Sequence, residues 1–169
     1  RSSVQEYLGH VPFLDKRVLE IGPASGFLTF YMESLGATVV GCELPKGEDW
    51  DIVPYAGIDH KTFIDSRNDL HRRLVNGFWL AHEAHQSKAG IVLASAYQVP
   101  SDIGVFDVAT FSMVLLHMRD PFLALKNVLE CTTGTVVITE LFPWSFMPED
   151  IQRAFGARRS VPGPVEGFS

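Results

Sequence analysis

The chain has 169 residues, of which 46% are hydrophobic and 20% charged, as is typical of one globular domain and not of a disordered chain. Its formal net charge of −6 disfavours tight binding to duplex nucleic acid, because such binding requires a basic surface. No apolar run reaches the roughly 18 residues that a membrane span needs, and the first residues lack a secretory signal pattern.

Short apolar runs and helical patterns alternate along the first half of the chain. Residues 17–21 predict a buried strand that ends at a glycine turn, and apolar residues at helical spacing follow over 27–35. Residues 38–43 predict a second strand, and the segment 44–55 is rich in proline, glycine and charge, as expected of a loop. A long helical pattern then covers 62–86, where Asn76-Gly77 should split or kink the helix. This connection is longer than a usual crossover, which indicates a role beyond joining two strands.

The second half predicts three more strands, at 91–95, 106–111 and 135–140. A helix should open at Asp120-Pro121, an N-cap acid followed by proline at the first helical position, and Thr133-Gly134 should turn the chain into the last strand. This alternation predicts an α/β fold, a Rossmann-like three-layer sandwich with a mostly parallel sheet. An extended helical insertion separates strands two and three.

The whole chain, 1–169, is expected to form a single domain. Its core should cover about 17–140. The sequence shows no clear strand after Glu140, so we expect the C-terminal strands of the sheet to be missing or incomplete.

The first turn, Gly22-x-x-x-Gly26, follows the first strand and opens the first helix. Glycines there let the backbone approach a ligand closely, and the helix start offers free N–H groups. The spacing is neither the dinucleotide fingerprint Gly-x-Gly-x-x-Gly nor a P-loop, which disfavours a pyrophosphate ligand. Glu43, at the end of the second strand, can accept hydrogen bonds from both hydroxyls of a ribose. Together these features predict a ligand with a ribose that need not carry phosphates.

Three segments in order carry a family resemblance. Residues 18–26 resemble the first motif of the class I S-adenosylmethionine-dependent methyltransferases, Glu/Asp-x-Gly-x-x-x-Gly. Residues 106–121 are similar to the fourth-strand region of that superfamily, and 136–140 to its fifth strand. The resemblance implies S-adenosylmethionine as cofactor and S-adenosylhomocysteine as product. Within the superfamily, residues 76–82 and 111–121 look like a branch near the tRNA wobble-uridine methyltransferases.

The resemblance also implies roles for particular residues around the cofactor. The family often has an aspartate after the third strand that accepts from the adenine amino group; this chain has Ser95 there, with Asp102 as a weaker substitute. Four groups of residues are expected to contact the cofactor: Glu20, Gly22, Pro23, Ala24, Ser25 and Gly26 at its amino-acid end, Glu43 and Leu44 at the ribose, Ser95, Ala96 and Tyr97 at the adenine, and Phe111 and Ser112 near the methyl group.

Methyl transfer from a sulfonium needs mainly positioning and exclusion of water, and a general base only when the acceptor must lose a proton. His117, just past the fourth strand, is the leading candidate for a catalytic base, ahead of Tyr97, Glu140 and His82. Trp50, Trp79 and Trp144 could line an acceptor pocket. His82 and His85 have no further metal ligands, so no metal site is expected.

The acceptor should be a small molecule or a modified nucleoside, with no duplex nucleic acid or membrane as partner. Two alternatives stay open: an NAD-dependent oxidoreductase, and a non-catalytic methyltransferase-like binding module. Cys42 and Cys131 lack redox or metal spacing, which is typical of reduced thiols in a cytoplasmic protein.

Overall fold

The computed structural model describes residues 2–47, 50–51 and 56–140. The helices and strands follow one another as α1 (Ser2–Tyr7), β1 (Arg17–Ile21), α2 (Phe27–Ser34), β2 (Thr38–Glu43), α3 (His60–His85), β3 (Gly90–Leu93), β4 (Phe106–Ser112), α4 (Pro121–Glu130) and β5 (Thr132–Thr139). Single 3-10 turns cover Ser101–Ile103 and Leu115–His117.

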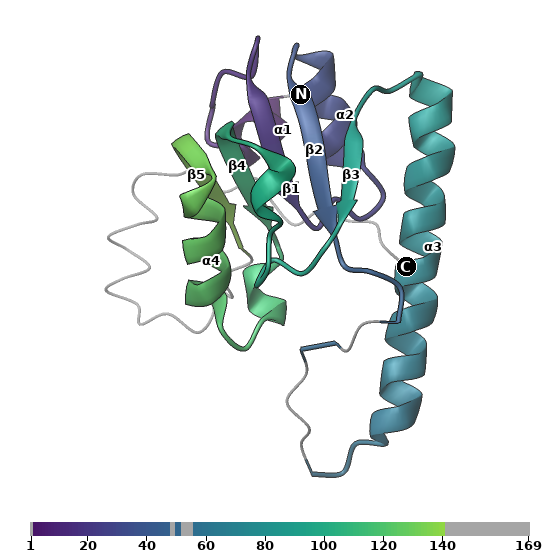
Figure 1. The fold of residues 1–169 in the computed structure, drawn as a ribbon. Coiled ribbons are helices and arrows are strands. Elements are labelled where there is room, and N and C mark those ends of the chain that lie inside the picture. The colour runs from purple at the N-terminus through teal and green to yellow at the C-terminus, as the bar shows by residue number, and fades with distance from the viewer. Residues whose placement is uncertain (1, 48–49, 52–55, 141–169) are drawn as a thin grey trace, which may run out of the picture.

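The five strands form one parallel sheet in the order β3-β2-β1-β4-β5 (Figure 1). The chain runs outward from β1 to β3 and then crosses back to β4, so the strand order reverses beside β1. In open α/β sheets, ligands bind beyond the carboxyl ends of the strands at such a reversal. The sheet therefore confirms the expected Rossmann-like architecture and places a candidate site at the ends of β1, β2 and β4.

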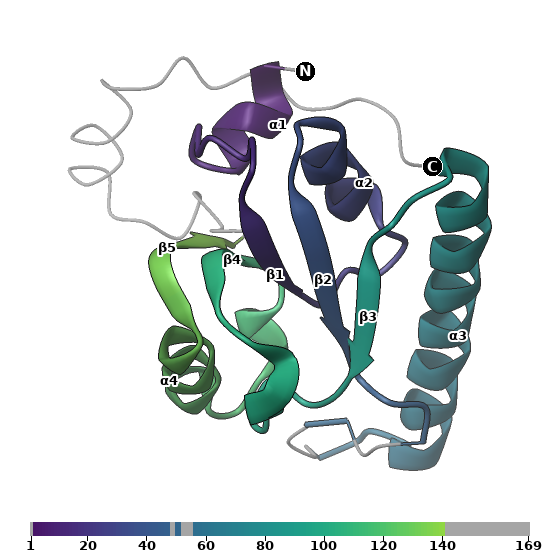
Figure 2. The same ribbon diagram turned by 45° about the horizontal axis from the view of Figure 1, so that its top comes forward.

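Helices pack on both faces of the sheet (Figure 2). An apolar cluster lies on each face. On one face, Leu8 after α1 and Met32 of α2 pack with Val18, Val39 and Val108 of the strands. On the other face, Ala124 and Val128 of α4 pack against Leu19, Phe106 and Phe111. These side chains alternate in direction along the strands, so the three central strands β1, β2 and β4 are buried on both sides. The helices and the sheet make the expected three layers.

Helix α3 is one continuous element of 26 residues, so the expected break at Asn76-Gly77 is wrong. Its start is fixed by Asp59, whose side chain accepts a hydrogen bond from the backbone N–H of Thr62. Directly after Gly77, Phe78 is buried with its ring centre 5.3 Å from that of Phe30 on α2. This packing holds the helix together across the glycine, because tertiary contacts outweigh the weak helix propensity of one residue.

Other elements also differ from the expectations. Helix α1 was not expected from the sequence, and β3 ends at Leu93 instead of at residue 95, which leaves Ser95 in a loop. Strand β5 begins at Thr132, and Thr133-Gly134 lies within the strand at a shift of register. A Cβ on Gly134 would come within 2.3 Å of the Asp107 carbonyl oxygen, so this irregular pairing requires a glycine. Among the described residues, no helix combines the length and apolarity that crossing a bilayer demands.

Candidate functional site

The turn after β1 has a backbone conformation that its residues make possible. Gly22 and Gly26 adopt φ values of 69° and 86°, in the left-handed region that glycine tolerates best. A Cβ on Gly26 would lie 2.4 Å from Cε2 of Phe30, so glycine is also needed for space. Ala24 is left-handed as well, with φ 52°, and its N–H donates to Oε2 of Glu43 at 3.2 Å. The turn is thereby tied to the end of β2.

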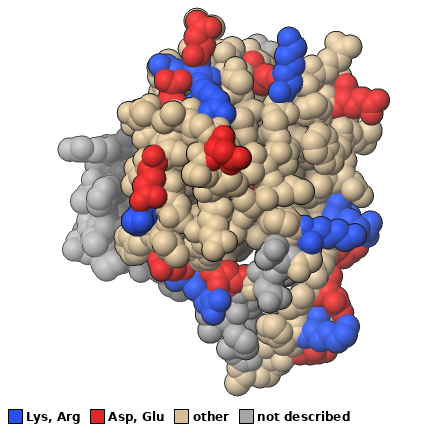
Figure 3. Space-filling view, viewed as in Figure 1, with Lys and Arg blue, Asp and Glu red and all other residues tan. Residues whose placement is uncertain are grey.

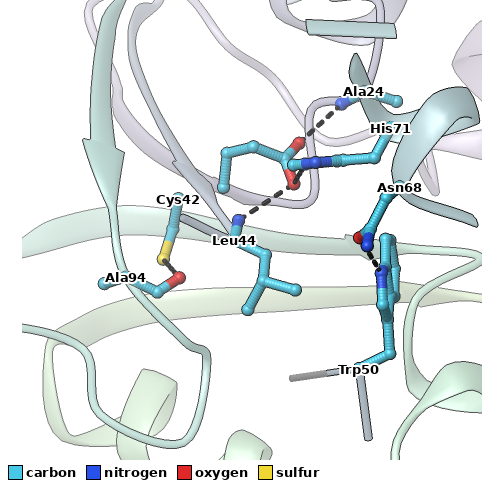
Figure 4. Close-up of polar contacts among 8 residues, drawn as sticks. Ala24, Cys42, Leu44, Trp50, Asn68, His71 and Ala94 are labelled. Atoms are coloured by element: carbon cyan, nitrogen blue, oxygen red, sulfur yellow. Dashed lines mark hydrogen bonds and ion pairs between the residues drawn. The ribbon is translucent and has the colours of Figure 1, made fainter. Parts of the chain in front are cut away.

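Glu43 is the centre of a hydrogen-bonded group (Figure 4). Besides Ala24, the N–H of Leu44 donates to its Oε1 at 2.9 Å, and Nε2 of His71 lies 3.1 Å from the same oxygen. His71 comes from α3, and the edge of its ring meets the Trp50 indole at a centroid distance of 5.5 Å. The carboxylate is therefore held by the glycine turn, by its own strand end and by the inserted helix.

A cavity of about 1100 Å³ opens at the carboxyl ends of the strands. Helix α3 supplies one wall, with Leu70 and Leu74, and the segment after β4 supplies another, with Met113 and Val114. Nine of the residues that the sequence assigned to the cofactor or to catalysis line it: Gly22, Ala24, Glu43, Leu44, Ser95, Ala96, Tyr97, Ser112 and His117. The sheet therefore brings together residues from four separate segments.

Asp51 joins three loops at one end of this cavity. Its carboxylate accepts hydrogen bonds from the Tyr97 hydroxyl and from both the backbone N–H and Nε of Arg119. Burial raises the pKa of Asp51, but these hydrogen bonds outweigh that effect and leave the pKa below its ordinary value. Asp51 is thus a stable anion whose charge is matched by Arg119.

The loop after β3 is held in place from both sides. The Ser95 hydroxyl accepts from the backbone N–H of Tyr97 at 3.2 Å, and the Asn127 amide of α4 donates to the carbonyl oxygen of Tyr97. Ser112, at the end of β4, lines the cavity, but its Oγ is buried and lies beside the Tyr7 hydroxyl of α1.

Five of the expected cofactor residues lie outside the cavity lining: Glu20, Pro23, Ser25, Gly26 and Phe111. Phe111 is fully buried in the core on the α4 face of the sheet, because its side chain points away from the cavity. Glu20 is 2% exposed and accepts a hydrogen bond from the Thr29 hydroxyl. Burial raises the pKa of Glu20 to about 7; Thr29 opposes this rise, and the nearby charge of Glu43 adds to it.

His117 lies at the solvent-exposed end of the cavity, in the 3-10 turn after β4. Glu140 stabilises this turn, since its Oε1 accepts from the N–H of Leu115 at 2.8 Å. Burial lowers the pKa of His117, the charge of Arg67 lowers it further, and Glu140 opposes both. The imidazole is therefore neutral near pH 7 and able to accept a proton.

The remaining residues that the sequence offered for catalysis, for the acceptor pocket or for the adenine lie mostly outside the cavity. Nε2 of His82 lies 3.0 Å from the Ala89 carbonyl oxygen, and His85 stacks on Phe30. Trp50 lines the cavity, whereas Trp79 lies at a separate small hollow, and Trp144 falls outside the described residues. Asp102 is exposed in its 3-10 turn, away from the cavity. Within the described ranges, no group of three or more metal-ligating side chains comes together.

Sequence reasoning missed four charged or polar residues of the cavity, namely Asp51, Arg67, His71 and Arg119. Two of them share a signal that could have been used: Arg67, Leu70, His71 and Leu74 lie at helical spacing on one face of α3. The helical pattern was identified from apolar members of this face such as Leu70 and Leu74, and the polar residues between them received no role. Asp51 sits in a proline- and glycine-rich segment without periodicity, which carries no comparable signal.

Comparison with known proteins gives one family. The model of a methyltransferase domain family matches residues 2–159. No curated protein sequence matches the chain significantly.

Solved structures resemble the chain in fold at low identity. The cyclase SpnF has a TM-score of 0.59 at 16% identity, with 82% of this chain and 44% of that chain covered. An S-adenosylmethionine-dependent methyltransferase from Mesorhizobium loti has a TM-score of 0.58 at 16% identity, with 87% of this chain and 56% of that chain covered. Magnesium protoporphyrin IX methyltransferase from Synechocystis PCC 6803, solved with bound SAH, has a TM-score of 0.57 at 11% identity, with 95% of this chain and 62% of that chain covered. The chain thus spans about half the length of the structures it resembles.

Proposed function

The chain belongs to the methyltransferase domain family, and from this premise we propose that it transfers a methyl group from S-adenosylmethionine to a small acceptor. The observation that carries the proposal is the placement of Glu43. Its carboxylate ends β2, faces the cavity and is fixed to the glycine turn through Ala24. That is where an open α/β sheet holds a ribose.

The residues present fit this cofactor. A carboxylate offers about four lone-pair positions, of which Ala24, Leu44 and His71 use three in Glu43, so a ribose hydroxyl has a remaining acceptor. The glycine turn, with Gly22 and Ala24, lines the same cavity beside this carboxylate. The volume of about 1100 Å³ exceeds that of a typical small-molecule site, which leaves room for a cofactor and an acceptor together.

The proposed mechanism relies on positioning. Bound S-adenosylmethionine supplies a methyl group on a positively charged sulfur, which needs no further activation. Glu43 would hold the ribose, the backbone of Gly22 and Ala24 would approach the amino-acid end, and the 95–97 loop would flank the adenine. His117 would accept a proton from an acceptor hydroxyl or amine, since its neutral imidazole lines the same cavity.

The acceptor class proposed is a small molecule, with a modified nucleoside as the second candidate. Figure 3, viewed as in Figure 1, shows acidic and basic side chains interspersed around a broad uncharged area on the described part of the face in view. A binder of duplex nucleic acid would need a continuous basic stripe instead. The resemblance to the wobble-uridine branch favours the nucleoside.

We also propose a cytoplasmic location, because Cys42 and Cys131 are free thiols, as is typical of a reducing compartment.

Thermal unfolding with S-adenosylhomocysteine, and with NAD as control, tests the proposal. A ligand that binds only the folded state at about a hundred times its Kd adds about 2.7 kcal/mol to the free energy of unfolding. We expect a rise in Tm with S-adenosylhomocysteine and none with NAD. Stabilisation by NAD alone would instead support an oxidoreductase. Binding of S-adenosylhomocysteine without methylation of any acceptor tried would support a binding module.

A further inference from the structure

The solvent-exposed end of the cavity differs in chemistry from the end that holds Glu43. Arg67 of α3 and His117 of the turn after β4 both line the cavity, close enough for the charge of Arg67 to act on His117. Leu70 and Leu116, from the same two segments, also line the cavity and are 47% and 52% exposed, so they offer apolar surface there. We define these four residues, Arg67, Leu70, Leu116 and His117, as the outer subsite.

The charges around the cavity are distributed unevenly. Both carboxylates of the lining have their own donors: Glu43 is bound by Ala24, Leu44 and His71, and Asp51 by Tyr97 and Arg119. The outer subsite contains no carboxylate among its own members. Its permanent charge is the guanidinium of Arg67, and that charge reaches His117, whose pKa falls first through burial and then through Arg67.

Arg67 is also held in a defined position. Its guanidinium carbon lies 5.1 Å from the ring centre of Phe63, one turn earlier on α3, which is within the range of a cation–π contact. The side chain is half-buried, so its charge is screened less than that of a fully exposed arginine. A planar guanidinium fork of this kind suits a carboxylate or a phosphate group, with which it can form two parallel hydrogen bonds.

We propose that the outer subsite binds the acceptor through an anionic group, a carboxylate or a phosphate attached to an apolar body, with Arg67 as the residue that recognises the anion. Leu70 and Leu116 would contact the apolar body, and His117 would lie beside the group that is methylated. This inference rests on the proposed function and specifies its substrate class. It gives Arg67 a role in acceptor specificity and none in cofactor binding.

Titration calorimetry on the whole chain saturated with S-adenosylhomocysteine tests the inference. The probes are benzoate, phenyl phosphate and the neutral benzamide, and saturation is verified for each variant before a probe is added. We expect at least one anionic probe to bind about tenfold more tightly than benzamide, because a charge-assisted bidentate contact is stronger than a neutral one. The stronger of the two anions identifies carboxylate or phosphate as the recognised group.

Variants on one helix separate local recognition from net charge. Arg67→Gln should abolish the anion preference, and Arg67→Lys, which keeps the charge without the fork, should retain part of it. Arg73→Gln is the matched control: Arg73 is 70% exposed, pairs with Asp69 on the same helix and lies outside the cavity. It should leave the preference intact.

Three results would overturn the inference: no binding of either anion, equal binding of benzamide, or a preference that persists in Arg67→Gln. Equal losses in Arg67→Gln and Arg73→Gln would also overturn it, since they would indicate a general charge effect. Failure of the cofactor assignment is distinguishable, because the wild-type chain would then not bind S-adenosylhomocysteine at all. A chain that binds the cofactor and methylates nothing would still show the anion preference.

Discussion

Glu20 should make the stability of this protein fall as the pH rises. It lies in the centre of β1, is 2% exposed, and has a pKa raised by burial from 4.5 to about 7. In the unfolded chain the same carboxyl should titrate near its ordinary value. Between these two values the folded state binds more protons than the unfolded state, so the free energy of unfolding decreases with pH. The contribution is full below about pH 4.5 and is lost as the pH passes about 7.

The size of this effect follows from the shift. A rise from 4.5 to about 7 corresponds to about 3 kcal/mol between the acidic and alkaline limits. Glu20→Gln removes the titration but keeps an oxygen that can accept the hydrogen bond from Thr29. Urea unfolding of wild type and variant, at steps from about pH 5 to about pH 8, measures the difference between the two curves.

We expect the variant to gain about 2.5 kcal/mol relative to wild type over this range, because part of the shift is already lost at pH 5. All other titrating groups are shared by the two proteins and cancel in the comparison. The surface variant Glu130→Gln, which removes an exposed carboxylate paired with Lys126, should run parallel to wild type. Parallel curves for Glu20→Gln would refute the reasoning, since they would mean that Glu20 titrates in the folded protein as it does in the unfolded chain.

Two further predictions concern the glycine turn and the inserted helix. Gly26→Ala should lower the free energy of unfolding by about 3 kcal/mol, because a Cβ would overlap Phe30. The control Gly47→Ala, at φ 89° and in open space, should lower it by about 1 kcal/mol through backbone strain alone. Thermal unfolding compares the two variants, and equal losses would contradict the overlap. His71→Ala should weaken S-adenosylhomocysteine binding about tenfold because Glu43 loses one of its three donors, and His71→Gln should restore part of the affinity. Calorimetry in the Glu43→Ala background should show no further loss from His71→Ala, and additive losses would argue against this coupling.

Much of the fold was predictable because local signals agreed with the tertiary structure. The apolar run at 17–21 and the acid at Glu43 marked strand ends correctly, and strand–helix alternation led to the observed parallel sheet. Asp120-Pro121 also gave the correct start of α4. Errors arose where a contact distant in sequence outweighed a local preference. The packing of Phe78 on Phe30 keeps α3 continuous through Gly77, and the pairing of Thr132 with Phe106 extends β5 backward through Gly134.

The site was predictable to the extent that it follows from the ends of strands. Glu43 was placed by that rule, whereas Ser95 and Ser112 were placed by the family resemblance, and each of the three lines the cavity. His71 could not be placed, because its contact with Glu43 depends on how α3 docks across 28 positions of sequence. Phe111 shows the converse limit: a strand residue beside the site can point into either face, and this one points into the core.

Calorimetric titration of S-adenosylhomocysteine into wild type, Glu43→Ala and the surface control Glu130→Ala tests the central claim most directly. The account predicts micromolar binding to wild type and to the control, a loss of about tenfold to a hundredfold in Glu43→Ala, and no heat with NAD. Unchanged affinity in Glu43→Ala would contradict the assignment of the ribose to this carboxylate. No binding of S-adenosylhomocysteine to the wild-type chain would contradict the proposed function itself.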